Sequence, residues 1–159
     1  MGIVVLGAVF IDIKGHSTSS YIPDGRNVGT VEEVHGGVSR NVVEDIANVE
    51  LRPKFVSLVD ESGIGTGVLE KLNNHKVDTR FVRRTPDGMG KWLAVFDNHG
   101  DVVASISKRP DLSAINDILD EQGDEIFGDA DSIALEIDME KDTIKRVFKY
   151  AEKYNLKVY

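Results

Sequence analysis

The sequence contains no cysteine among its 159 residues. Disulfides, thiolate metal sites and cysteine nucleophiles are therefore excluded. A chain without disulfides suits a reducing compartment, and we predict a cytoplasmic location. The histidines are few and show no metal-ligand spacing, so we predict no metal site from them: His16, His35, His75 and His99.

Basic charge is also scarce, because 19 Lys and Arg residues face 27 Asp and Glu residues and the formal net charge is −8. General binders of nucleic acids and of anionic membranes need a field of positive charge, so we expect neither partner. A small phosphate-bearing ligand needs only a local site and stays possible.

Long apolar runs are absent, since no stretch approaches the roughly 18 apolar residues that suggest a membrane span. The apolar start, residues 1–11, has no basic segment before it and meets a charge at Asp12. We therefore interpret this start as a buried strand and not as a signal peptide.

The composition is that of a globular protein, with 41% hydrophobic and 29% charged residues. The length suits one domain of ordinary size, which can bury about 70% of its unfolded surface. We therefore treat residues 1–159 as part of one folded unit.

Strand-like and helix-like segments alternate along much of the chain. We expect strands at 3–6, 28–34, 54–59, 77–83, 133–137 and 156–159, with loop or irregular edge structure over 15–30. Helical periodicity follows Ser39, a candidate N-cap, and recurs at 63–76, 112–127 and 143–154. This β-α-β order predicts an α/β fold: a Rossmann-like, mostly parallel sheet with helices on its faces.

One segment interrupts this pattern. Two strand-like runs, 91–96 and 102–107, flank an Asp-Asn-His-Gly-Asp turn at 97–101. This is typical of a β-hairpin, and a hairpin inside a β-α-β series indicates an accessory sheet. The sequence then stops inside an expected strand, which we interpret as the mark of a fragment or a truncated gene.

Two places could carry ligand chemistry. Gly36 and Gly37 stand before a helix whose first turn holds Asn41, and such glycines let the backbone approach a ligand closely. Asp12 follows the first strand and could accept hydrogen bonds from sugar hydroxyls. The alternatives are a simple connecting turn at the glycines and a solvated carboxylate at Asp12.

Other motifs are weaker. The glycines of 63–67 lack the spacing of a dinucleotide fingerprint, and no P-loop motif is present, so we interpret 63–67 as a structural turn. Trp92 is interpreted as a packing residue of the hairpin, with stacking on a ligand as the alternative. Lys108 and Arg109 are interpreted as exposed.

The segments 3–12 and 36–41 together resemble the first strand and the G-G-x-x-x-N signature of pfkB-family (ribokinase-like) carbohydrate kinases. The form G-G-V-x-R-N and the later hairpin are most similar to pseudouridine kinases within that family. The resemblance implies a Rossmann-like domain with a small β-sheet lid, formed near 13–34 and 88–107. It also implies a substrate site at Asp12, Gly36, Gly37 and Asn41.

The resemblance further implies a sugar or nucleoside substrate, ATP and Mg²⁺ for the intact enzyme, and a possible homodimer through the lid. Two departures stand out. Asp60 and Ser62 replace the Gly and Asp of a family turn in which only Gly65 matches. The second signature, with the catalytic Asp, is expected beyond Tyr159, so we expect residues 1–159 alone to be inactive and to bind ATP poorly.

Three functional hypotheses stay open from the sequence. The first is the substrate-binding part of a sugar or nucleoside kinase. The second is a non-catalytic sugar-binding or dimerisation module. The third, a nicotinamide-dependent enzyme, depends only on the glycines of 63–67. The sequence does not choose among ribose, fructose phosphate, a nucleoside and pseudouridine as the ligand.

Overall fold

A computed structural model describes residues 2–159, which form two β-sheets and four helices. The first sheet is entirely parallel, with its strands in the spatial order β5-β4-β1-β8-β9. Its strands are β1 (Ile3–Leu6), β4 (Lys54–Val59), β5 (Val82–Arg84), β8 (Ser132–Leu135) and β9 (Lys157–Val158). The predicted α/β class is therefore confirmed.

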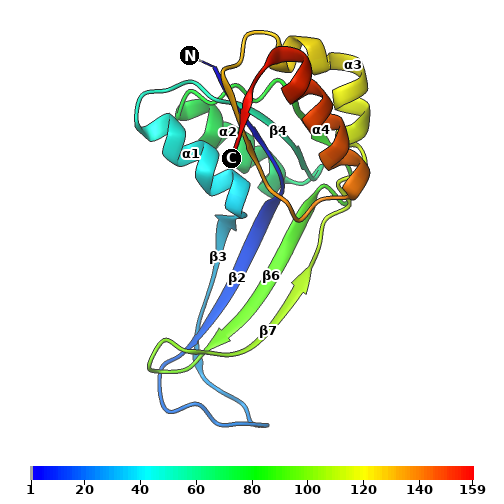
Figure 1. The fold of residues 1–159 in the computed structure, drawn as a ribbon. Helices are drawn as coiled ribbons and strands as arrows, with labels where there is room; N and C mark the ends of the chain where they lie inside the picture. Colours follow the sequence, from blue (N-terminus) through cyan, green and yellow to red (C-terminus); the bar gives the residue numbers. More distant parts are fainter. Residues whose placement is uncertain (1) are drawn as a thin grey trace.

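Four helices cover the two faces of the parallel sheet (Figure 1). They are α1 (Val38–Asn48), α2 (Gly63–Asn74), α3 (Ile115–Phe127) and α4 (Lys141–Tyr154). Successive strand residues point to opposite faces, so Val4 and Leu6 pack on the α3–α4 side while Val5 packs with residues of α1 and α2. Each face thus has its own apolar core.

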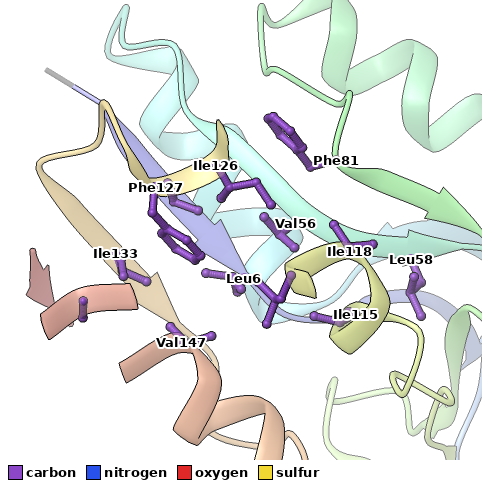
Figure 2. Close-up of a cluster of buried hydrophobic side chains, with 13 residues drawn as sticks. Leu6, Val56, Leu58, Phe81, Ile115, Ile118, Ile126, Phe127, Ile133 and Val147 are labelled. Carbon is purple, nitrogen blue, oxygen red and sulfur yellow. The ribbon is translucent and has the colours of Figure 1, made fainter. Parts of the chain in front are cut away.

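Figure 2 shows the core on the α3–α4 side, where aromatic and branched side chains interlock beneath the helices. Phe127 from the end of α3 lies near Ile133 of β8, and Val147 of α4 closes the cluster. Their complete burial means that this layer depends on the hydrophobic effect and on close packing.

The second sheet is mixed and has the order β3-β2-β6-β7. Its strands are β2 (Val9–Ser17), β3 (Gly29–Gly36), β6 (Met89–Phe96) and β7 (Val102–Lys108). β2 pairs antiparallel with β3 and parallel with β6, and β6 and β7 form the predicted hairpin. Figure 1 shows that this sheet extends away from the helices, with its far end bare on both sides.

Several predicted boundaries are wrong. Residues 9–17 form a continuous strand although 15–30 was expected to be loop, and β3 is longer than the expected 28–34. The strand expected at 77–83 shrinks to β5, with only an isolated bridge at Asp78. No helix formed by residues 2–159 combines the length and apolar character needed to cross a bilayer.

Ser39 is not the N-cap of α1, because the cap position is Gly37 and no side chain caps this helix. The Ser39 hydroxyl lies inside the protein, where it donates to Leu6 O at 3.2 Å or to Glu136 Oε2 at 2.7 Å. This residue therefore ties α1 to the ends of β1 and β8.

The core makes a direct prediction about stability. Replacing the fully buried Phe127 by alanine should lower the free energy of unfolding by about 3–5 kcal/mol, because the change leaves a cavity. Phe148→Ala is the matched control, since the Phe148 side chain is 47% exposed, and it should cost less than about 1 kcal/mol. Urea titrations measure both values, and equal losses in the two variants would contradict this description of the core.

Candidate functional site

The glycine pair lies where the chain returns from the second sheet to the parallel sheet. Gly37 has φ 98° and ψ 131°, a conformation that side chains rarely adopt. A Cβ atom on Gly37 would lie 2.7 Å from Ala8 O and 2.9 Å from Phe10 N. Glycine is therefore required here, since it alone lets the start of α1 lie against the start of β2.

Asp12 lies within β2 and not after a strand end, so that part of the sequence interpretation is wrong. Its register partners are Val34 on β3 and Trp92 on β6. A Cβ atom on Gly36 would lie 2.5 Å from Asp12 Oδ2, so the glycine provides the space that the carboxylate occupies. The structure thus places Asp12 directly beside the glycine pair.

Partial burial raises the pKa of Asp12, whereas the positive charges of Lys14 and Arg40 act in the opposite direction. The carboxylate is half-buried and donates no hydrogen bond when ionised. An ionised Asp12 can therefore accept hydrogen bonds from a pair of hydroxyl groups on a ligand.

Asn41 lies one helical turn beyond the glycine pair, where its backbone N–H donates to Gly37 O at 3.0 Å. Its side-chain Oδ1 accepts from Arg40 Nε at 3.2 Å and from Arg40 Nη2 at 2.8 Å. Because Arg40 occupies the side-chain oxygen of Asn41, the side-chain amide nitrogen of this exposed residue is left to donate to a ligand.

Arg40 is only 6% exposed and is held by a buried ion cluster. Its Nη2 lies 2.6 Å from Glu44 Oε2, and Lys71 Nζ lies 3.1 Å from Glu44 Oε1. Burial alone would raise the pKa of Glu44, but the Lys71 hydrogen bond and the charge of Arg40 lower it overall. Because a buried cation needs such partners, this cluster fixes the position of Arg40 beside Asn41.

His35 precedes the glycine pair but points to the opposite face of the second sheet from Asp12, as its pairing with Ile11 shows. Burial is the main cause that lowers the pKa of His35, and the positive charges of Arg40 and Lys71 lower it further. The imidazole is thus kept neutral at neutral pH, and the structure does not bring it to the Asp12 carboxylate.

Glu136 is a candidate site residue that the sequence reasoning missed. Its Oε2 accepts from Ala8 N at 2.9 Å as well as from Ser39 Oγ. It borders a cavity of about 300 Å³ that Phe10 and Arg109 also line. The available signal was its place just after β8, since carboxyl ends of parallel strands are where α/β proteins bind ligands.

The remaining sequence motifs have structural partners. Ser62 caps α2 by accepting from Ile64 N and Gly65 N, and Asp60 Oδ1 also accepts from Gly65 N. The first N–H groups of this glycine-rich helix are thus bonded within the protein, which supports a structural turn. Lys108 and Arg109 form exposed ion pairs with acidic residues at 2.6 and 2.8 Å.

A larger cavity, of about 550 Å³, lies between α3 and α4 and is lined largely by Lys, Arg and Asp side chains. Its basic residues are mostly paired, for example Arg146 with Asp120 and Lys153 with Asp124, so we do not assign the site there. Within residues 2–159, no group of three or more His, Asp or Glu side chains is placed to hold a metal ion.

Comparison with known proteins agrees with this geometry. The family described as pfkB family carbohydrate kinase matches residues 2–158. A guanosine-inosine kinase from Exiguobacterium acetylicum is 35% identical over 158 residues, which is 99% of this chain and 52% of that protein. A pseudouridine kinase from Escherichia coli strain K12 is 26% identical over 106 residues, 66% of this chain and 34% of that protein.

Among solved structures, a ribokinase from Arabidopsis thaliana in complex with ribose and ATP superimposes with a TM-score of 0.77 at 20% identity. The match covers 98% of this chain and 51% of that one, and it shows a ribokinase-like fold. The chain spans about half the length of the guanosine-inosine kinase.

The glycine junction makes a testable prediction. Gly37→Ala should lower the free energy of unfolding by about 2–5 kcal/mol, because the methyl group meets backbone atoms and the φ angle is strained. Gly63→Ala is the control, since a Cβ atom there meets nothing within 4 Å and should be neutral or stabilise by up to about 1 kcal/mol. Chemical denaturation measures the stability of the two variants. Similar unfolding midpoints would contradict the close approach of Gly37 to the start of β2.

Proposed function

The chain belongs to the pfkB family of carbohydrate kinases, and on this premise we propose that it is the substrate-binding portion of a kinase for a sugar or nucleoside hydroxyl. The observation that carries the proposal is the seating of Asp12 against Gly36, with Asn41 one turn further along α1. By the sequence resemblance described above, these residues match the family's sugar-binding Asp and its Gly-Gly…Asn signature, which supports the proposal.

The chemistry of these groups suits a polyhydroxylated ligand. An ionised carboxylate accepts hydrogen bonds from two adjacent hydroxyls, while the Asn41 amide donates to a hydroxyl oxygen. The carboxylate of Glu136, at the carboxyl end of β8, offers a further acceptor beside the same part of the protein. Together these groups would hold and orient the sugar while leaving one hydroxyl free to be phosphorylated.

A nucleoside is the substrate class that the relatives favour. Both curated relatives carry the name of a nucleoside kinase, and the guanosine-inosine kinase matches almost the whole chain. Pseudouridine, which the sequence motifs favoured, is supported only by the more distant relative. A simple sugar such as ribose is the alternative.

ATP, with Mg²⁺, is the phosphoryl donor that we propose for the complete enzyme. The ATP bound in the Arabidopsis ribokinase structure supports the donor. No catalytic step is assigned to the described residues. The inactivity of residues 1–159 alone and the cytoplasmic location stay predictions.

The second sheet is the proposed lid over the substrate. The face of this sheet that points away from the Asp12 side chain carries Leu93 and Ile106. These two residues are register partners and are 43% and 71% exposed. Exposed apolar side chains in this arrangement favour association with a second copy, so a homodimer through this sheet is part of the proposal. The same face is what favours the second candidate function, a non-catalytic dimerisation module.

The test is thermal unfolding of the chain with pseudouridine, uridine, guanosine, inosine, ribose or fructose 6-phosphate. A ligand at 100 times its Kd should stabilise the native state by about 2.7 kcal/mol, which raises Tm by several degrees. Asp12→Asn should weaken binding by about tenfold or more, because hydrogen bonds to a charged acceptor are lost.

Asp101→Asn is the control, because Asp101 lies in the exposed hairpin turn, and it should keep the wild-type response. Absence of any shift in the wild-type chain would contradict the proposed site. A full shift retained in Asp12→Asn would mean that the ligand binds elsewhere.

A further inference from the structure

The Asp12 face of the second sheet carries aromatic side chains that the proposed function leaves without a role. Asp12 pairs with Trp92 of the neighbouring strand, and His16 pairs with Phe96 four residues further along the same two strands. Because every second residue of a strand points to the same face, Asp12, His16, Trp92 and Phe96 all lie on one side of the sheet.

These rings form one ordered cluster. The imidazole of His16 stacks on Phe96, with ring centroids 4.6 Å apart and planes inclined by 15°. Phe96 in turn meets Trp92 in an edge-to-face contact at 6.2 Å, with an interplanar angle of 89°. Since His16 supports Phe96 and Phe96 contacts Trp92, the orientation of the indole is set by its neighbours.

The cluster lies where a ligand can reach it. All three aromatic side chains are only half-buried, and the far part of the sheet extends beyond the helices (Figure 1). A partly exposed indole beside a carboxylate offers an apolar surface next to a polar anchor. This is the combination that a nucleoside requires, because its sugar is polar and its base presents flat faces.

The direction of the sheet places the two parts of a nucleoside. The sugar, held at Asp12 and Gly36, lies near the carboxyl edge of the parallel sheet, where α/β proteins place the reacting end of their ligands. A base attached to the opposite end of that sugar would extend away from the parallel sheet. Trp92 lies beside Asp12 as its register partner, and Phe96 lies four residues farther along β6, which runs away from the parallel sheet (Figure 1).

We propose that Trp92 is the stacking surface for the base of a nucleoside substrate, and that Phe96 and His16 position its indole. This inference rests on the proposed function and adds to it the residues that distinguish a nucleoside from a free sugar. Stacking recognises the flat face of any base, so purine and pyrimidine nucleosides should both benefit.

Trp92 is the single tryptophan of the sequence, so its fluorescence reports on this surface alone. Uridine and guanosine should quench the emission of the chain in a saturable way, whereas ribose should bind without quenching. Calorimetry should then show that Trp92→Leu weakens nucleoside binding by roughly 5- to 150-fold and leaves ribose affinity unchanged.

Two further variants separate stacking from packing. Trp92→Phe keeps a flat ring and should retain most of the nucleoside affinity. Phe148→Leu removes a half-exposed ring from α4 on the parallel sheet and should bind both ligands as the wild type does. Unchanged melting of Trp92→Leu without ligand would show that its sheet is intact.

The outcomes distinguish the two levels of the proposal. If wild-type protein binds ribose and nucleosides equally well, or if Trp92→Leu loses both alike, the stacking inference is wrong while the sugar site stands. If wild-type protein binds neither ligand, the proposed function itself is contradicted, and the inference falls with it.

Discussion

The close approach of Gly37 to the start of β2 is the contact on which both sheets depend. The chain leaves the parallel sheet between β1 and β2, and it returns to that sheet through Gly36 and Gly37. The backbone of Gly37 lies against the backbone of Ala8 and Phe10, where the chain enters β2. Any side chain at Gly37 would separate them by meeting Ala8 O. The neighbouring Gly36 provides the space in which the Asp12 carboxylate lies. Two adjacent glycines therefore join the two sheets and leave room for the candidate ligand-binding carboxylate.

Buried charge gives this junction its rigidity. Arg40 is almost fully buried, and its guanidinium is held by the Glu44 carboxylate and by the side-chain oxygen Oδ1 of Asn41. Lys71 completes the pairing of Glu44. Burying these charges costs desolvation energy, and separating any one charge from its partner would leave it buried and unpaired. The cluster therefore adopts one arrangement. The orientation of the Asn41 amide is thus established before a ligand arrives, and less ordering is left for binding to supply.

Much of this architecture was predictable, and the failures have physical reasons. The helices and parallel strands show clear apolar periodicity, and the hairpin shows its turn residues, so both were found. Residues 9–17 were not recognised as one strand, because glycine and polar side chains late in the segment imitate a loop; Asp12 was therefore misplaced at a strand end. The inward-facing Ser39 depends on contacts between distant segments, which no local pattern contains. Glu136 follows a parallel strand directly, and this signal was not used. The pairing of Asp12 with Trp92 likewise follows from strand register, which the sequence alone does not specify.

We propose that one ligand contacts the glycine pair, the start of α1 and the Asp12 face of the second sheet together. An NMR titration of the ¹⁵N-labelled chain with a nucleoside tests this arrangement. We expect shifts of the backbone amides of Gly36 and Gly37, of the Asn41 side-chain amide and of the Trp92 indole N–H. Shifts confined to the basic surface of α4, or no shifts at millimolar ligand, would contradict it.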